Sequence, residues 1–179
     1  MPRTNSGYSL YELLMSLGLL AIVLGLGVPS LSYFVADKRL RAQADALFHT
    51  VHLARQQSIT SRRIITLCPS VDGENCDSEH RWAAGWILFA NRPGSDERRR
   101  DADEPVVWRH AGSGAPLTIR SNRATYSFRS TERRATNGTI TLCDPEGRAP
   151  ARAVVVSYTG RPRVAYRDTR GRPYRCALG

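Results

Sequence analysis

The order of apolar and polar positions divides the chain into an N-terminal helix and a β-rich remainder. Between Glu12 and Asp37 lie 24 consecutive uncharged residues, mostly Leu, Ile, Val, Ala and Gly. A helix rises about 1.5 Å per residue, so about 20 of them would cross the roughly 30 Å hydrocarbon core of a bilayer. The pattern therefore predicts one membrane-spanning helix, at about residues 13–33. Pro29 lies inside this run and is expected to kink it.

Beyond Asp37 the pattern becomes amphipathic with the period of a helix. Apolar or small residues recur at spacings of three and four, at Leu40, Ala44, Leu47, Val51, Ala54 and Ser58. Lys38, Arg39, Arg41 and Arg55 lie off this stripe. We therefore expect the helix to continue to about residue 60 and to pack its apolar stripe under a sheet.

Short β-rich runs separated by turn residues follow the helix. The expected strands are 64–68, 85–90, 105–108, 117–120, 125–129, 138–143, 153–158 and 163–167. Asp96 to Glu104 is expected to be an exposed loop, because eight of its nine residues are charged. No linker divides the region, so residues 61–179 are interpreted as one head. The expected fold class is α+β, with a long N-terminal helix packed against an antiparallel β-sheet head.

Positive charge gathers in the C-terminal tail, residues 160–179. The whole chain has 26 Lys+Arg against 16 Asp+Glu, and this surplus favours polyanionic partners. Between residues 160 and 175 there is one acid, Asp168, and six arginines: Arg161, Arg163, Arg167, Arg170, Arg172 and Arg175. The planar fork of arginine suits phosphate oxygens, and Tyr158, Tyr166 and Tyr174, which interleave with the arginines, are residues that stack on unpaired bases. The alternative is an ordinary strand and turn with solvated arginines.

The four cysteines, Cys68, Cys76, Cys143 and Cys176, do not have the C-x-x-C spacing of a redox or zinc site. An even number of cysteines in a translocated domain indicates two disulfides, with three possible connectivities. We favour Cys68–Cys76, which closes a short loop, and Cys143–Cys176, which would hold the tail against the head. The alternative is four buried thiols.

Other chemistry finds little support in the sequence. His80 and His110 stand alone, and no G-x-S-x-G, H-E-x-x-H or P-loop pattern occurs. His49 and His52 lack a third metal ligand. A cluster of four carboxylates lacks the spacing of an EF-hand loop, so a solvated acidic loop is expected instead; it comprises Asp72, Glu74, Asp77 and Glu79. We expect neither an enzyme nor a protein with a metal or cofactor.

The beginning of the chain resembles the prepilin peptidase site of type IV pilins and type II secretion pseudopilins. The resemblance lies in residues 7–13, Gly-Tyr-Ser-Leu-Tyr-Glu-Leu. In that family the leader is cut after the glycine, and an acid is the fifth residue of the mature chain. The resemblance thus implies a leader of residues 1–7, a mature, N-methylated chain that starts at Tyr8 after Gly7, and a pilin helix over residues 8–60. It also implies that Glu12 meets the terminal amine of a neighbouring subunit during assembly. Tyr8 and Tyr11 depart from the usual phenylalanine and aliphatic residue.

Two alternatives compete with the pilin interpretation of this segment. An ordinary signal peptide cut near residues 30–32 would have a more basic n-region and no acid at Glu12. In the second alternative, Glu12 is only a residue at headgroup level near the edge of the apolar run. A carboxylate within a bilayer costs at least roughly 2.5–3.5 kcal/mol, so one that is buried there needs a partner.

The head is similar to FimT/GspH-type minor pilins. The similarity lies in residues 65–89, around Ile-Thr-Leu-Cys-Pro-Ser and Gly-Trp-Ile-Leu-Phe, and in residues 154–163. Gly160-Arg161-Pro162-Arg163 resembles the G-R-x-R tail motif of FimT-type pilins implicated in DNA uptake. The resemblance implies that Arg161 and Arg163 contact phosphates and that Arg167, Arg170, Arg172 and Arg175 enlarge the patch.

The function implied by this resemblance is that of a type IV minor pilin. Such a subunit sits in the inner membrane with one span and a periplasmic head, is cut by the prepilin peptidase, and then joins a pilus on the cell surface. Its partners would be other pilins and extracellular double-stranded DNA, bound without sequence preference for natural transformation. Two alternatives remain: a structural or priming minor pilin that does not bind DNA, and a GspH-type minor pseudopilin of type II secretion.

Overall fold

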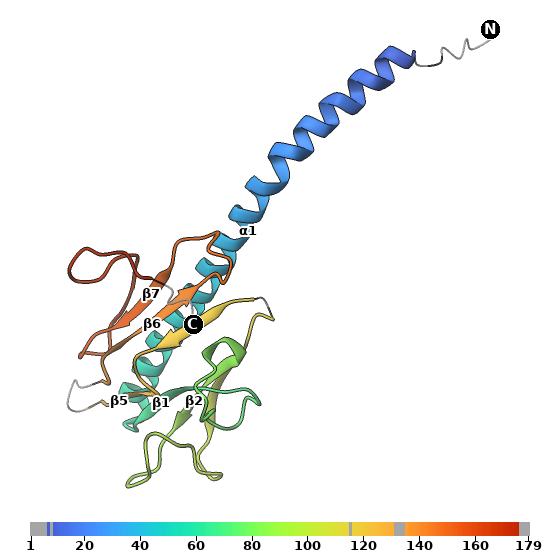
Figure 1. Ribbon diagram of the computed structural model, residues 1–179. Helices are drawn as coiled ribbons and strands as arrows, with labels where there is room; N and C mark the ends of the chain where they lie inside the picture. Colours follow the sequence, from blue (N-terminus) through green and yellow to red (C-terminus); the bar gives the residue numbers. More distant parts are fainter. Residues whose placement is uncertain (1–6, 8, 115, 131–134, 176–179) are drawn as a thin grey trace.

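One long helix carries a head built of strands (Figure 1). The structure is a computed structural model that describes residues 7, 9–114, 116–130 and 135–175. Within these ranges the elements are α1 Leu10–Ser61, β1 Ile65–Pro69, a 3-10 turn η1 Trp82–Ala84, β2 Gly85–Ala90, β3 Val106–Ala111, β4 Thr118–Ser121, β5 Tyr126–Phe128, β6 Gly138–Cys143, β7 Arg152–Val156 and β8 Pro162–Ala165. All eight strands expected from the sequence are present, with ends displaced by at most three residues.

The beginning of α1 is set by a capping residue. Ser9 has extended backbone angles, and its hydroxyl oxygen accepts a hydrogen bond of 3.2 Å from the backbone N–H of Glu12. A serine followed three residues later by a glutamate is the sequence signature of a helix start, and an acid in the first turn also favours the helix dipole. The helix continues through Pro29 without a break and ends at Arg62, whose φ of 53° is left-handed.

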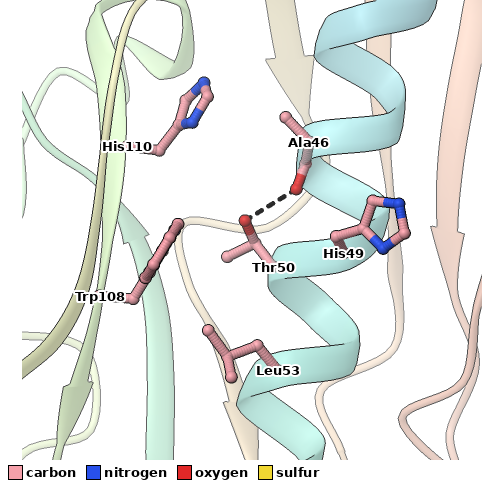
Figure 2. A pocket seen from close by; sticks show the side chains of 6 residues that line it. All are labelled: Ala46, His49, Thr50, Leu53, Trp108 and His110. Atoms are coloured by element: carbon pink, nitrogen blue, oxygen red, sulfur yellow. Dashed lines mark hydrogen bonds between the residues drawn. The ribbon is translucent and has the colours of Figure 1, made fainter.

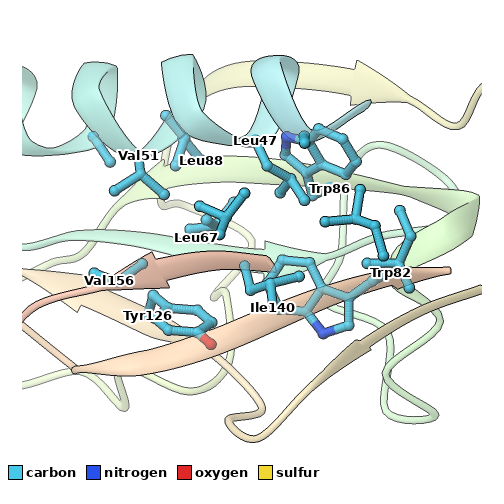
Figure 3. Packing of buried hydrophobic residues seen from close by; sticks show 14 of the residues in the cluster. Leu47, Val51, Leu67, Trp82, Trp86, Leu88, Tyr126, Ile140 and Val156 are labelled. Carbon is cyan, nitrogen blue, oxygen red and sulfur yellow. The ribbon is translucent and has the colours of Figure 1, made fainter. Parts of the chain in front are cut away.

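The second half of α1 packs under the head as the sequence predicts. All six residues of the stripe are fully buried: Leu40, Ala44, Leu47, Val51, Ala54 and Ser58. The polar member is accommodated because the Ser58 hydroxyl donates to the carbonyl oxygen of Arg55 at 2.8 Å. Figure 3 shows Leu47 and Val51 reaching from the helix into the side chains of the strands. The helix prediction is confirmed here residue by residue.

The head contains two four-stranded antiparallel sheets, and the expected fold class, a long helix packed against an antiparallel β head, is confirmed. Their strand orders are β3-β2-β1-β5 and β4-β6-β7-β8. The division arises because β4 pairs with β6 and not with β3 or β5, its neighbours along the chain. Both sheets pack against α1, and buried side chains of β1, β2, β5, β6 and β7 join those of the helix in one core.

Aromatic side chains fill the space between the helix and the sheets. Trp82, Trp86 and Tyr126 are at most 1% exposed and lie in the same cluster as Leu67, Leu88, Ile140 and Val156 (Figure 3). The indole N–H of Trp86 donates to the hydroxyl oxygen of Thr50 on α1 at 3.1 Å, which fixes the helix to β2 by a buried polar contact. The core thus lies along α1, and the outer face of the second sheet is left for other contacts.

The charged loop is less exposed than its composition predicts. Glu104 is only 1% exposed, and its carboxylate accepts hydrogen bonds from the backbone N–H groups of Arg92 and Asp101 and from the hydroxyl of Ser95. Burial acts to raise the pKa of the Glu104 carboxyl, but these hydrogen bonds outweigh it and hold the pKa below its usual range. The expectation of a fully exposed loop was wrong at Glu104, because the loop uses this side chain to satisfy its own backbone.

Candidate nucleic-acid interface

A tight turn between β7 and β8 presents the first arginines of the tail. The N–H of Gly160 donates to the Ser157 carbonyl at 2.9 Å, and the N–H of Arg161 donates to the Ser157 hydroxyl oxygen at 3.1 Å. Gly160 has a φ of +73°, and a Cβ placed there would lie 3.2 Å from Phe128 Cδ1 and 3.3 Å from Ala135 Cβ. A glycine is therefore required both by the left-handed backbone and by the close packing.

The alternation of β8 places Arg161 and Arg163 on the outer face of the second sheet. Val154 and Val156 of β7 are at most 1% exposed and face the core, so Val155 between them faces outward. Arg163 is paired with Val155 and shares its face. Arg161, two residues earlier, lies on the same side. Both arginine side chains are exposed.

After β8 the chain forms a second turn, residues 166–174, which we call the tail hairpin. Tyr174 donates its backbone N–H to the Tyr166 carbonyl at 3.2 Å, and Asp168 donates to the Arg172 carbonyl at 2.8 Å. The sequence repeats a Gly-Arg-Pro triplet, at residues 160–162 and 171–173, and Gly171 of the second has a φ of +77° at the bend. The repeated triplets of the sequence are thus two successive turns, and the second lies beside β8.

Two of the predicted arginines are used within the tail hairpin. The carboxylate of Asp168 accepts bonds from the N–H groups of Arg170 and Arg172 and forms an ion pair of 2.9 Å with the Arg172 guanidinium. The backbone N–H of Arg172 is the main reason why the pKa of Asp168 lies below its usual range. Arg167 donates to the Gly171 carbonyl at 2.9 Å. Arg172 and Arg167 therefore stabilise the hairpin.

The remaining predicted arginines are free to meet an external anion. The guanidinium groups of Arg161, Arg163 and Arg170 are exposed and have no acidic partner among the residues that the structure describes. Arg175 is also exposed and lies at the last described position. The members of the predicted set are therefore not equivalent: Arg167 and Arg172 stabilise the hairpin, and the others are exposed.

A groove lies between the outer face of the second sheet and the tail hairpin; we call it the tail groove. Its volume is about 490 Å³. It is lined by Arg120, Ser121, Asn122, Thr139, Thr141, Val155, Arg163, Asp168, Thr169 and Tyr174. Of the six predicted arginines only Arg163 lines it. Arg120, on β4, was missed by the sequence analysis because the order of the strands, and no local motif, brings it to this face.

The three tyrosines of the tail lie in different surroundings. Tyr174 lines the tail groove, whereas Tyr158 is exposed near the β7–β8 turn. Tyr166 lies under the guanidinium of Arg152, whose Cζ is 5.2 Å from the ring centroid. Arg152 is itself buried and forms an ion pair with Asp37 of α1. This arginine, also unrecognised from the sequence, holds the start of the tail against the helix and is unavailable to a ligand.

A second hollow, between α1 and β3, is mainly a packing feature (Figure 2). It has a volume of about 280 Å³ and is lined almost entirely by apolar atoms, with His49 on the helix wall and His110 on the strand wall. The ring of His110 stacks on Trp86 at 4.0 Å, and burial lowers its pKa. Among the described residues no group of three His, Cys, Asp or Glu side chains is placed to hold a metal ion.

The disulfides agree with the favoured pairing as far as the structure describes them. Cys68 and Cys76 are bonded, with a Cα–Cα distance of 5.6 Å. Cys143 is also disulfide-bonded. Cys176, its predicted partner, lies outside the described residues, as does Tyr8 of the predicted cleavage site. Gly7 and Glu12 are exposed.

The first half of α1 has no packing partner within the chain. It is long and apolar enough to cross a membrane. Its described large side chains between Leu10 and Phe34 are more than half exposed. An apolar surface of this size on a single chain requires a lipid or protein environment. A long helix, half of it uncovered and half of it packed under antiparallel sheets, defines the type IV pilin-like class of subunit, which is anchored in a membrane and carries a soluble head.

Comparison with known proteins identifies the family within this class. Residues 43–160 match the model of the family described as Type II transport protein GspH. The match covers more than half of the chain, and the chain belongs to this family. No curated protein matches the sequence significantly.

Solved structures show the same fold. The type IV minor pilin FimU of Pseudomonas aeruginosa PAO1 superposes with a TM-score of 0.54 at 19% identity, over 74% of this chain and 92% of FimU. A second crystal form of FimU gives 0.50 at 18% identity, over 70% and 91%. The minor pseudopilin EpsH from the Type 2 Secretion System of Vibrio cholerae gives 0.43 at 11% identity, over 71% and 96%. The superposition on FimU shows that the chain has the fold of this minor pilin.

Proposed function

We propose that the chain is a minor pilin of the type IV pilus that joins the filament through α1 and binds extracellular duplex DNA without sequence preference. The observation that carries the DNA-binding part is the set of exposed arginines on β8, on the turn before it and on the tail hairpin after it. Arg161, Arg163 and Arg170 have no acidic partner within the described chain, although ion pairs are common elsewhere in the head. The bound DNA would enter the cell when the filament retracts, as in natural transformation.

Processing at Gly7 belongs to the same proposal. The prepilin peptidase would cut after Gly7, and the new amine on Tyr8 would be methylated. Glu12 lies in the first turn of α1 on an uncovered apolar surface, so its carboxylate needs a cationic partner within a membrane or filament. The terminal amine of a neighbouring subunit would supply it. N-terminal sequencing of the mature protein should begin at Tyr8; a mature chain starting near residue 33 would contradict membrane anchoring and the filament model together.

The DNA-binding part is tested by the salt dependence of affinity. The full-length chain in uncharged detergent micelles would be titrated against a labelled duplex at several salt concentrations. Contacts to phosphates release counterions, and each contact contributes about 0.9 to the magnitude of the log–log salt slope for duplex DNA. The double variant Arg161→Gln/Arg163→Gln should therefore bind more weakly and with a slope lower by about 1.8.

The matched control is Arg98→Gln/Arg99→Gln in the charged loop. It removes the same charge from two exposed side chains that form no ion pair among the described residues. Arg100 is left intact because its guanidinium donates to the carbonyl oxygens of Glu104, Glu74 and Ala102. If the control weakens binding as much as the tail variant, only diffuse positive charge is at work. If the wild-type chain binds no duplex at low salt, the subunit is a structural or priming pilin.

A pseudopilin of type II secretion is the second candidate function. The name of the matching family, Type II transport protein GspH, favours it, whereas FimU is a type IV minor pilin. The genes beside this one separate the two: pilus or competence genes support the first candidate, and secretion genes support the second.

A further inference from the structure

We propose that the tail groove binds a short single-stranded segment of DNA, with Arg120 and Arg163 at the phosphates and Tyr174 against a base. This inference rests on the proposed function, since it specifies which form of the DNA the head holds and where. When an unpaired end enters the groove, the exposed arginines outside it would contact the backbone of the adjoining duplex. A duplex without an unpaired end leaves the groove empty, and Arg163 then contacts the duplex backbone as proposed above.

The two arginines reach the groove from opposite edges of one sheet. Arg120 lies on β4 and is paired with Thr141; Arg163 lies on β8 and is paired with Val155, which in turn is paired with Thr139. Paired residues share a face, so both guanidiniums and both threonine hydroxyls are directed to the outer side. Because β4 and β8 are three strand spacings of about 4.8 Å apart, their backbones are separated by about 14 Å. This span exceeds the distance between adjacent phosphates, so the two cations are suited to phosphates that are not neighbours along one strand.

The charge of the lining favours an anion in spite of the acid within it. Asp168 is the one carboxylate among the lining residues. Both of its oxygens are occupied, by the N–H groups of Arg170 and Arg172 and by the Arg172 guanidinium. Arg120 and Arg163 are exposed and form no ion pair within the described chain. The positive charge of the groove is therefore left uncompensated.

The aromatic wall of the groove favours an unpaired base. The groove is open to solvent, and its volume of about 490 Å³ is large enough to admit a base. The tail hairpin forms one wall and contributes the ring of Tyr174. Bases in a duplex are stacked on one another and do not offer a face to this ring, whereas unpaired bases stack on aromatic side chains whatever their sequence.

The test compares a labelled oligothymidylate with a labelled duplex, using the full-length chain in uncharged detergent micelles. Tyr174→Ala should weaken binding of the single strand at least about fivefold, because the stacked ring is lost. Duplex affinity should change less than about twofold. Tyr174→Phe, which keeps the ring, should bind like wild type, and Tyr158→Ala, which removes an exposed tyrosine outside the groove, should also be neutral. Arg120→Gln should lower the salt slope for the single strand by about 0.7 and leave the duplex slope unchanged.

Each other outcome decides against the groove in a distinguishable way. If Tyr174→Ala weakens both ligands equally, the residue only supports the tail hairpin and the groove holds no base. If neither Tyr174→Ala nor Arg120→Gln affects the single strand while Arg161→Gln/Arg163→Gln still weakens the duplex, the groove proposal falls and the proposed function stands. If wild type binds neither DNA, both fall. A melting curve for each variant separates loss of binding from loss of fold.

Discussion

The two charged, turn-rich surfaces of the head use their charges differently. We call residues 70–81 and 92–104 the front loops. There Arg81 pairs with Asp77 and Glu79, and Arg92 pairs with Asp101 and Asp103. In the tail, Arg172–Asp168 is the ion pair found among the described residues, and the other arginines outnumber the acids.

Carboxylates of the front loops also serve the backbone. Asp72 accepts bonds from the N–H groups of Glu74 and Asn75, at 2.8 Å each, and Glu104 does the same for its own loop. Such loops fold back on themselves, and most of their charged groups other than Arg98 and Arg99 already have partners within the chain. The tail reaches a comparable shape with glycine turns and main-chain bonds, so its arginines remain available. The comparison shows that the number of charged residues predicts a binding surface only when the residues already paired within the chain are left out of the count.

The largest expected difference between the two surfaces concerns their disulfides. A disulfide stabilises the folded protein because it lowers the entropy of the unfolded chain. The Cys68–Cys76 bond, between residues eight apart, should add roughly 2.5 kcal/mol to the free energy of unfolding. A Cys143–Cys176 bond would close a 34-residue loop and should add roughly 4 kcal/mol. Cys143→Ser should therefore lower the free energy of unfolding more than Cys68→Ser does. Chemical denaturation measures both, and non-reduced peptide mapping should recover the Cys143 and Cys176 peptides joined. Recovery of alkylatable thiols at these positions would contradict the pairing.

Removing the buried acid of the front loops should have the next largest effect. Glu104→Ala leaves the N–H groups of Arg92 and Asp101 without their partner in a buried position. We expect a loss of roughly 2–3 kcal/mol in the free energy of unfolding, because these are hydrogen bonds to a charged group. DNA affinity should be unchanged. Equal stability of variant and wild type would mean that the loop does not depend on Glu104.

A smaller loss is expected at the β7–β8 turn. Gly160→Ala places a Cβ on a left-handed residue that is already close to Phe128 and Ala135. The strain should reduce stability by about 1–2 kcal/mol and shift Arg161, so that duplex binding also weakens. Gly147→Ala is a useful comparison, since that φ is also positive, at +68°, but no atom lies within 4 Å of the added Cβ. Similar losses in both variants would assign the effect to backbone strain alone.

Low pH should reduce stability modestly through the carboxyl groups of the front loops and leave the arginines of the tail unaffected. Hydrogen bonds from Asn75 hold the pKa of Asp72 below its usual range, and a bond from Arg81 does the same for Asp77. The unfolded carboxyls, with pKa values of about 4, then bind more protons than the folded ones, so stability falls as pH drops below about 5. The arginines of the tail stay charged throughout. Asp72→Asn should flatten the decline in denaturation midpoints between pH 5 and pH 3; an unchanged decline would assign it to other carboxyls.

The smallest expected effect on stability belongs to the exposed arginines of the tail. Arg161→Gln/Arg163→Gln should leave the free energy of unfolding within about 0.5 kcal/mol of wild type, because solvated surface side chains contribute little to folding. The denaturation midpoint measures this. A larger loss would mean that these side chains support the sheet and that any loss of DNA binding is indirect.

Local patterns in the sequence were sufficient to locate the helix and the strands of this protein. The spacing of Leu40, Ala44, Leu47 and the residues that continue their stripe identified the buried face of α1, because a helix repeats every 3.6 residues regardless of its partner. Alternation and turn residues located every strand within three positions. The cleavage-site resemblance at residues 7–13 and the Gly-Arg-Pro triplets are equally local signals.

Only the tertiary structure decided which of these residues act together. The division into two sheets depends on the pairing of β4 with β6, a contact between distant segments that periodicity does not encode. That pairing brings Arg120 to the face of Arg163, while an equally basic residue, Arg152, is buried against Asp37. Composition could not rank these arginines, because the availability of a charge depends on its neighbours in space, and strand order determines those neighbours.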